Sequence, residues 1–178
     1  MIAMRVNLKI KHKCKNIKLV VTDVDGVLTD GGLYYSKEGN VLKKFNVKDG
    51  MGVNILLRNN IKTVILTKEK SMITKKWAKE MNVSQVYEGF IKKELALKQI
   101  CKKYKITLKN IAFIGDDVND LEVIRKAGLS AVPNDSILQA KQLADYTCKA
   151  SGGKGCFREF IDAILLAKFP SKTKWYLI

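Results

Sequence analysis

The sequence has little proline, histidine and acidic charge. Its 178 residues include 2 prolines and 1 histidine, and 17 Asp and Glu stand against 33 Lys and Arg. Little proline and 47% hydrophobic residues argue against a disordered or fibrous chain and predict one globular domain over residues 1–178. The formal charge of +16 points to acidic ligands, from phosphates to nucleic acid, without choosing among them.

Long apolar runs and paired cysteines are also missing. No run approaches the roughly 18 apolar residues of a membrane span, and the basic N-terminal stretch lacks the apolar core of a secretory signal. We therefore expect a soluble, cytoplasmic protein. The single histidine and the absence of a CxxC pair argue against a zinc site or a disulfide framework. Free thiols are expected at all four cysteines, Cys14, Cys101, Cys148 and Cys156.

Hydrophobic periodicity alternates between two kinds of segment. Continuous apolar runs that end on polar residues predict buried strands at 17–23, 61–67 and 110–117. Helical patterns lie at 50–59, 72–81, 92–105 and 120–127. This alternation predicts an α/β protein with a doubly wound parallel sheet, in which ligands bind at the carboxyl ends of the strands. The polar ends of the three strands should therefore meet.

One segment interrupts the α/β alternation. The sequences LYYS and VLKKF, at residues 33–36 and 41–45, predict a β-hairpin just after the first acidic strand end. Farther along the chain, two short strands are expected at 128–132 and 144–148, and a last helix at 155–168. A tail follows at about 169–178, and no linker or repeat indicates a second domain.

Carboxylates gather at the predicted strand ends although acids are scarce in the chain. Asp23 and Asp25 follow the first strand, and a second acidic group follows the strand at 110–117: Asp116, Asp117 and Asp120. Oxygen ligands of this kind suit Mg²⁺. The alternative is that they are solvated loop acids and helix caps. Their concentration at strand ends favours the metal site.

Thr67 and Lys93 complete this group. A hydroxyl at a strand end and an ammonium at a helix start would both bind phosphoryl oxygens while a metal-bound Asp23 attacks phosphorus. Taken singly, each is an ordinary residue type, because strand-end threonines and helical lysines are common. Their order along the chain and their setting make them informative.

These motifs resemble a known family. DVDGVLTDG at 23–31, a strand-end Thr, a Lys at a helix start and GDDVND at 115–120 are similar to the four motifs of the haloacid dehalogenase superfamily of phosphohydrolases. FNVKDGMG, AGLSAVPND and SGGKGCFREF resemble one branch of it. That branch contains phosphatases of 3-deoxy-manno-octulosonate 8-phosphate and of nonulosonate 9-phosphates, and phosphatase-like domains fused to acylneuraminate cytidylyltransferases. The resemblance implies a Rossmann-like fold.

The resemblance also implies roles for individual residues. Asp23 matches the nucleophile that forms an aspartyl-phosphate, Asp25 the general acid and base, and Thr67 and Lys93 the phosphate-binding pair. Mg²⁺ would be held by Asp23, the backbone carbonyl of Asp25 and Asp116, with Asp117 and Asp120 in support. Substrate contacts are expected from Asn46, Lys48, Asp49, Gly50, Glu69 and Asn119. For the stretch 46–50, an ordinary hairpin-to-helix connection is the alternative.

Superfamily members often carry a cap domain, for which this chain leaves no room. About 41 residues separate Asp25 from Thr67 and about 25 separate Thr67 from Lys93. In the branch that the chain resembles, the hairpin at about 33–45 acts as a flap that closes the site of a neighbour in a homotetramer. Interface residues would then be Leu33, Tyr34, Tyr35 and Phe45; the alternative is a hairpin folded over its own sheet. We expect the end of the tail to pack near a neighbouring subunit's site and to influence product release through Trp175, Tyr176, Leu177 and Ile178. The alternative is a frayed, disordered tail.

The substrate expected from the resemblance is a phosphorylated 2-keto-3-deoxy sugar acid of eight or nine carbons. Octulosonate phosphatases typically read TGR after the second motif's strand, whereas this chain has Thr67-Lys68-Glu69-Lys70 and then Trp77. Glu69 is more similar to the nine-carbon enzymes, and Trp77 fits neither pattern. Positive charge for the substrate carboxylate would come from Lys68, Lys70, Lys75 and Lys76, unless that lysine-rich face is merely solvated.

Three other functions compete with this interpretation. A catalytically idle oligomerisation domain is disfavoured by the intact motifs. A phospho-accepting signalling domain draws its acidic pair and its phosphorylated Asp from different strands, unlike this DxD. Nucleic-acid binding lacks a basic motif with interleaved aromatic residues. The sequence therefore predicts an Mg²⁺-dependent phosphatase.

Overall fold

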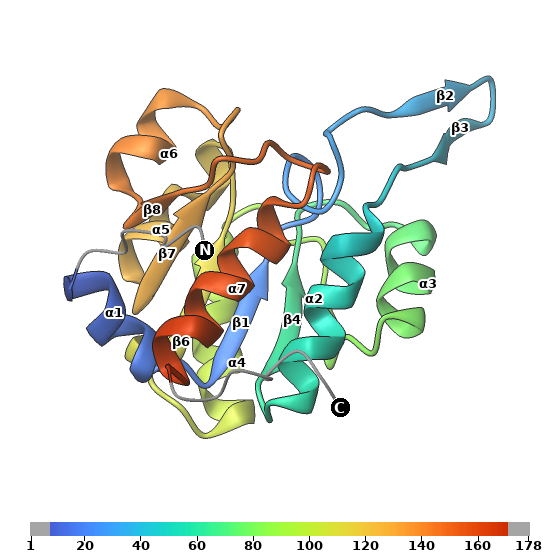
Figure 1. Ribbon diagram of the computed structural model, residues 1–178. Helices are drawn as coiled ribbons and strands as arrows, with labels where there is room; N and C mark the ends of the chain where they lie inside the picture. The colour runs from blue at the N-terminus through green and yellow to red at the C-terminus, as the bar shows by residue number, and fades with distance from the viewer. Residues whose placement is uncertain (1–7, 171–178) are drawn as a thin grey trace.

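The computed structural model describes residues 8–170, without the side chains of Lys9, Asn40 and Val41. A six-stranded parallel sheet forms its centre in the order β5-β4-β1-β6-β7-β8, as Figure 1 shows. Its strands are β1 (Leu19–Thr22), β4 (Lys62–Leu66), β5 (Gln85–Tyr87), β6 (Ile111–Ile114), β7 (Leu129–Val132) and β8 (Tyr146–Thr147). The predicted α/β class and parallel sheet are confirmed.

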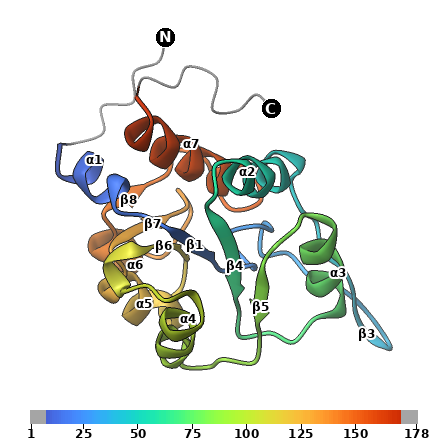
Figure 2. The same cartoon turned by 90° about the horizontal axis from the view of Figure 1, so that it is seen from below.

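Helices cover both faces of the sheet (Figure 2). Their bounds are α1 (Leu8–Lys15), α2 (Val47–Arg58), α3 (Met72–Glu80), α4 (Ala96–Tyr104), α5 (Leu121–Lys126), α6 (Leu138–Leu143) and α7 (Cys156–Lys168). Side chains alternate across a strand, so Val20 of β1 packs with α1, α2 and α7, while Leu19 and Val21 pack with α4, α5 and α6. The strands of the central pair are buried on both faces, which explains their continuous apolar runs.

The differences from the predicted elements lie mainly at element ends and in short polar segments. Residues 93–95 and 118–120, at the start of two predicted helices, form 3-10 turns before α4 and α5. The α1 and α6 helices were not predicted, because their sequences are short and polar. Cys14 nevertheless buries completely in the core, and Lys168 of α7 donates to the carbonyls of Lys15 and Ile17 at the end of α1.

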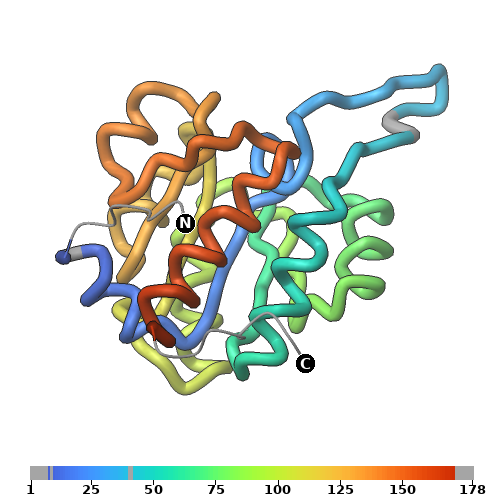
Figure 3. Tube along the Cα trace, viewed as in Figure 1, coloured from blue at the N-terminus to red at the C-terminus, as the bar shows by residue number. Residues whose placement is uncertain are grey.

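The hairpin consists of β2 (Tyr34–Ser36) and β3 (Gly39–Leu42), and it extends away from the sheet beside α2 and α3 (Figure 3). Its second strand ends earlier than predicted, because the sheet pairing stops at Leu42. Beyond it, Phe45 forms an isolated bridge with Thr29 and stacks on Trp77 at a centroid distance of 4.7 Å. Trp77, which fits no specificity pattern, is therefore a packing partner of the hairpin's base.

Two further expectations concern cysteines and membranes. All four cysteines are free thiols, as predicted. Within residues 8–170, none of the helices combines the length and the apolar character that crossing a membrane requires. The predicted role of the tail at Trp175 to Ile178 falls on residues outside the described range.

Candidate active site

The carboxyl ends of three neighbouring strands meet at one edge of the sheet. Asp23 follows β1, Thr67 follows β4, and Asp116 follows β6 by two residues. The strand pairing extends into these ends, since the Asp23 amide donates to Ile114 at 3.0 Å and the Thr67 amide donates to Tyr87 at 2.9 Å. The three side chains are thus held by the sheet itself.

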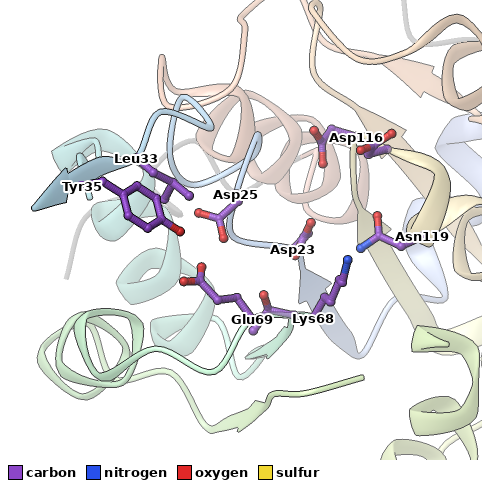
Figure 4. A pocket seen from close by; sticks show the side chains of 10 residues that line it. Asp23, Asp25, Leu33, Tyr35, Lys68, Glu69, Asp116 and Asn119 are labelled. Carbon is purple, nitrogen blue, oxygen red and sulfur yellow. The ribbon is translucent and has the colours of Figure 1, made fainter. Parts of the chain in front are cut away.

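A pocket of about 410 Å³ opens over this edge. Figure 4 shows its side chains, most of which are polar or charged. Its lining consists of Asp23, Asp25, Leu33, Tyr35, Thr67, Lys68, Glu69, Asp116, Asp117 and Asn119. The structure therefore brings together most of the residues that the motifs singled out, from elements far apart in the sequence.

Lys93 lies under the pocket as a buried cation. Its ammonium is 2.8 Å from Asp23 and 2.7 Å from Asp120, and its side chain is 0% exposed. Burial alone would lower the pKa of Lys93, but the two carboxylates outweigh it and raise that pKa. The lysine therefore stays charged and fixes the orientation of Asp23. Its direct contact with a phosphate stays a prediction, and the two carboxylates are the partners that the structure gives the ammonium.

Three carboxylates at the pocket floor fit a divalent cation. One oxygen each of Asp23, Asp116 and Asp120 lies within 4.8 Å of the others. Burial raises the pKa of Asp116 to about 8, with the charges of Asp23 and Asp120 adding to it, and burial raises that of Asp23 to about 7. The Asp116 Oδ1 atom is buried and has no hydrogen-bond partner among residues 8–170, which is costly unless a cation binds there.

Asp120 also organises the loop that carries Asp116. Its Oδ2 accepts hydrogen bonds from the amides of Asp116 at 3.0 Å and Asp117 at 3.4 Å, while its Oδ1 accepts from Lys93. Both oxygens are thus already used within the protein. This places Asp120 as a support for the loop and for Lys93, and leaves Asp23 and Asp116 as the carboxylates that face the pocket.

Two glycines permit the close approach of the surrounding loops. Gly26 has a φ of +82°, and a Cβ atom there would lie 2.0 Å from the Asp116 carboxylate. A Cβ on Gly152 would lie 2.1 Å from the Gly26 carbonyl oxygen. The loop at 151–155, whose sequence carried part of the resemblance, is therefore the packing support of the first acidic loop.

Asp25 belongs to a second charged group that the sequence did not reveal. The Lys43 ammonium lies 2.9 and 2.7 Å from the two Asp25 carboxylate oxygens and also binds Glu69. Thr29 donates to Asp25 Oδ1 at 3.2 Å. Burial raises the pKa of Asp25 although Lys43 lowers it. Lys43 follows a short strand in a chain rich in lysine, so no sequence signal distinguished it from its neighbour Lys44.

The predicted substrate contacts divide into two groups. Glu69 and Asn119 line the pocket, whereas residues 46–50 do not belong to its lining, so their substrate contacts stay a prediction. Asn46 caps α2 by accepting from the Lys48 amide, and Asp49 is 0% exposed and accepts from the Arg158 amide at 2.8 Å. Gly50 packs against Met81 and Trp77. Lys48 is exposed at the start of the helix and likewise does not reach the pocket.

Comparisons with known proteins agree with this fold and site. The family model of the haloacid dehalogenase-like hydrolases matches residues 56–158. The 3-deoxy-D-manno-octulosonate 8-phosphate phosphatase KdsC of Haemophilus influenzae is 36% identical over 163 residues, which cover 92% of this chain and 91% of that protein.

Two solved structures carry bound ligands or metals. The 3-deoxy-D-manno-octulosonate 8-phosphate phosphatase of Moraxella catarrhalis, in complex with a magnesium ion, a phosphate ion and a KDO molecule, has a TM-score of 0.87 and 38% identity, with 90% of this chain and 92% of that chain covered. The cobalt-bound phosphatase of Haemophilus influenzae has a TM-score of 0.87 and 35% identity, with coverages of 93% and 99%.

These findings define the class as a phosphatase, that is, a phosphoric monoester hydrolase. The chain belongs to the haloacid dehalogenase-like hydrolase family. Magnesium is the cofactor of phosphatases in this family, in agreement with the predicted Mg²⁺ and with the carboxylate cluster at the pocket floor. The resemblance stated from the motifs is confirmed, whereas the roles of the individual residues stay predictions.

Proposed function

We propose that the protein hydrolyses the phosphomonoester of a 2-keto-3-deoxy sugar acid with Mg²⁺, and that 3-deoxy-D-manno-octulosonate 8-phosphate is its substrate. The observation that carries the proposal is the placement of Asp23 at the pocket floor, oriented by the buried Lys93 and facing Asp116. Relatives that cover about nine tenths of this chain bear the name of that activity.

The reaction divides into two displacements on phosphorus. An Asp23 oxygen attacks phosphorus, the bond from phosphorus to the sugar oxygen breaks, and the sugar oxygen takes a proton from the Asp25 carboxyl group. Water then attacks the phosphorus of the aspartyl-phosphate, Asp25 takes a proton from that water, and Asp23 is released with inorganic phosphate. One carboxyl group thus serves as acid in the first half and as base in the second.

The other residues of the pocket have supporting roles in this scheme. Asp23, Asp116 and the backbone carbonyl of Asp25 would hold Mg²⁺, which when bound neutralises the charge of the phosphoryl oxygens. Thr67, at the end of β4 and 3% exposed, offers its hydroxyl to a phosphoryl oxygen. Lys68, an exposed residue on the pocket lining, offers the positive charge nearest to an anionic substrate.

A nine-carbon nonulosonate 9-phosphate is the second candidate substrate. The observation that favours it is Glu69, which lines the pocket where octulosonate phosphatases typically carry arginine. Here, however, Glu69 binds Lys43, so its negative charge is balanced by a cation of the flap. The names of the relatives support the eight-carbon substrate, and both sugars belong in the test.

We also propose that the flap joins copies of this chain in a homotetramer. Tyr34 and Leu42 are cross-strand partners, and each is 60% exposed. Partners across an antiparallel pair point to the same side, so these two apolar side chains form one outward face, while Leu33 and Tyr35 line the pocket. An exposed apolar face of this kind suits a self-complementary contact.

A catalytically idle domain associated with an acylneuraminate cytidylyltransferase is the alternative. Such a domain does not need buried carboxylates of raised pKa around an open pocket, since these charges destabilise the fold. The cluster is therefore better explained by catalysis.

The test compares the wild-type protein with Asp23→Asn on octulosonate 8-phosphate, nonulosonate 9-phosphate and glucose 6-phosphate. We expect octulosonate 8-phosphate to be the best substrate, because an acidic sugar meets Lys68, and glucose 6-phosphate to be poor. Asp23→Asn should lower kcat by about 10³-fold or more. The matched control is Asp30→Asn on the same loop, an exposed residue whose carboxylate lies 3.6 Å from the Lys44 ammonium and accepts a hydrogen bond from the Gly32 amide.

Three results would contradict the proposal. A folded Asp23→Asn protein with wild-type activity would exclude the nucleophile, and full activity in excess chelator would exclude the metal. Equal kcat/KM values for glucose 6-phosphate and for both sugar acids would exclude recognition of the substrate carboxylate. A higher kcat/KM for the nine-carbon sugar would replace the eight-carbon assignment and leave the chemistry intact.

A further inference from the structure

Lys43 is a cation with an enclosed side chain that the proposed reaction does not use. Its side chain is 0% exposed although it follows directly on β3 of the projecting hairpin. It lies between two carboxylates of the pocket lining, Asp25 and Glu69, which are 31% and 36% exposed. The cation thus links three parts of the chain: the flap, the loop after β1 and the loop after β4.

The contacts of Lys43 fix the Asp25 carboxylate from the side of the flap. Both Asp25 oxygens are within 2.9 Å of the ammonium, and Thr29 holds Oδ1 from the loop that carries Asp25 itself. An aspartate side chain has few rotatable bonds, so two donors from different elements suffice to define its position. Loss of Lys43 would leave Asp25 with one hydrogen bond from a neutral hydroxyl.

Lys43 also balances the negative charge of Glu69. A carboxylate at the end of β4 would repel the anionic substrate and Asp25 if it were unpaired. Binding to Lys43 balances this charge and adds a second anchor for the ammonium. Burial alone would lower the pKa of Lys43, but its bonds to Asp25 and Glu69 raise it.

We propose that Lys43 is a positioning residue that holds the Asp25 carboxyl group for proton transfer, and that Glu69 acts through Lys43 and not by contact with the substrate. This inference rests on the proposed function. The proton moves from Asp25 to the sugar oxygen as the bond from phosphorus to that oxygen breaks. Because Lys43 is carried by the flap, Asp25 takes its working position only when the base of the flap is seated on the pocket.

The leaving group provides the readout that separates positioning from a merely structural role. A sugar alkoxide needs a proton to depart, whereas p-nitrophenolate departs without one. The ratio kcat/KM reports the steps up to departure of the leaving group. A misplaced Asp25 therefore lowers kcat/KM for an alkyl phosphate and spares it for p-nitrophenyl phosphate, while a collapsed flap or pocket lowers both alike.

The experiment measures both substrates with Lys43→Met and with the matched control Lys44→Met. Lys44 is adjacent in sequence, but its side chain is 58% exposed and its ammonium lies 3.6 Å from Asp30. We expect Lys43→Met to lose about 30-fold in kcat/KM on the sugar-acid phosphate and less than about 3-fold on p-nitrophenyl phosphate, because a misplaced Asp25 loses only part of the roughly 10²–10⁴-fold that general acid catalysis contributes. Lys44→Met should match the wild-type protein on both.

Two further variants guard against a folding defect. Lys43→Arg keeps the charge and should recover most of the lost kcat/KM on the sugar-acid phosphate. Glu69→Gln keeps the ion pair between Lys43 and Asp25 but removes the ion pair that anchors Lys43 to Glu69. It should therefore lower kcat/KM on the sugar-acid phosphate by about 3- to 10-fold and spare p-nitrophenyl phosphate. Equal losses on both substrates, or no loss in any of these variants, would overturn the proposal.

Failure of this inference and failure of the proposed function give different results. If Lys43 has no positioning role, Asp23→Asn still abolishes turnover while Lys43→Met behaves like Lys44→Met. If the proposed function is wrong, Asp23→Asn retains activity on p-nitrophenyl phosphate. The comparison of leaving groups works with any alkyl phosphate that the wild-type protein hydrolyses, so it does not depend on the identity of the sugar.

Discussion

Two lysines in this protein each bridge two carboxylates, but in different surroundings. Lys93 joins Asp23 to Asp120 at the edge of the sheet, where all three side chains are at most 8% exposed. Lys43 joins Asp25 to Glu69 at the base of the flap, where about a third of each carboxylate is exposed. One bridge lies in a fixed part of the fold, and the other depends on how the flap is seated.

The difference in burial decides what each bridge does for the fold. Carboxylates deprived of their cation are strongly destabilising when buried, and far less so where water reaches them. The Lys93 bridge is therefore part of the folded structure as well as of the site. The Lys43 bridge positions a catalytic group at little cost or gain in stability.

The largest expected effect is that of Lys93→Met. It leaves the buried Asp23 and Asp120 carboxylates without the Lys93 cation, so we expect a loss of about 3–5 kcal/mol in unfolding free energy and no measurable turnover. Lys43→Met should lose about 1 kcal/mol or less, because its carboxylates are partly exposed. Urea unfolding at pH 7 of both variants checks the contrast, and equal losses of stability would contradict it.

Asp116 offers the next test, because it faces the cluster without a lysine of its own. With its pKa raised to about 8, Asp116 holds a proton at neutral pH in the metal-free folded state, whereas the unfolded chain releases it. This difference lowers the free energy of unfolding of the metal-free protein. Asp116→Asn should thus be more stable than the wild-type protein in chelator, yet bind Mg²⁺ roughly 100-fold more weakly. Thermal unfolding over a magnesium titration measures both, and an unchanged magnesium-induced shift in Tm would exclude Asp116 as a ligand.

Asp49 is a buried carboxylate without any lysine, held instead by the Arg158 amide. Burial raises its pKa from 3.8 to about 6, so its folded form binds a proton that the unfolded chain releases. Its contribution to stability is therefore present at low pH and is lost as pH rises from about 4 to about 6, by at most about 3 kcal/mol.

The variant Asp49→Asn should remove this part of the pH dependence and leave KM unchanged, because Asp49 does not line the pocket. Unfolding free energies of the two proteins between pH 4 and pH 7, measured in excess Mg²⁺, give the difference that belongs to Asp49. A parallel pH dependence in both proteins, or an increase in KM in the variant, would restore the substrate role expected from the sequence.

The smallest effect on the chemistry is expected from the outward face of the flap. Leu42→Lys places a charge on that face, opposite Tyr34 and away from the pocket. We expect it to disrupt the tetramer, to leave the Lys43 bridge intact, and to change kcat on p-nitrophenyl phosphate by less than about 3-fold. Light scattering at the assay concentration reports assembly, and a wild-type monomer with full activity would exclude the tetramer.

The two bridges also differ in how far the sequence predicts them. Asp23, Asp116 and Lys93 were found because strand periodicity brings strand ends together and because their motifs resemble those of a family. Sequence reasoning did not give Lys93 its place beneath Asp23, which depends on how the 3-10 turn at 93–95 packs. It assigned Asp120 to the metal but did not reveal that both Asp120 oxygens also accept hydrogen bonds from Lys93 and the loop amides.

The flap shows the limit of pattern-based prediction more clearly. Its existence followed from two short strands around a polar turn, but Lys43 and Lys44 are indistinguishable by type and spacing. Lys43 reaches Asp25 and Glu69 because of the way the base of the hairpin packs, with Phe45 stacked on Trp77. The role of residues 46–50 stays a prediction for a related reason, since a capping asparagine and a buried aspartate look the same in sequence as substrate contacts.

The central claim is that Asp23 accepts the phosphoryl group and that Asp25 moves the protons. Asp25→Asn mixed with p-nitrophenyl phosphate and Mg²⁺ tests it most directly, because this leaving group departs without a proton while release of the phosphoryl group needs a base. After acid quenching, mass spectrometry should find about one phosphoryl group per chain, on the peptide that contains Asp23. An unmodified Asp23, or a phosphoryl group on another residue, would contradict the account.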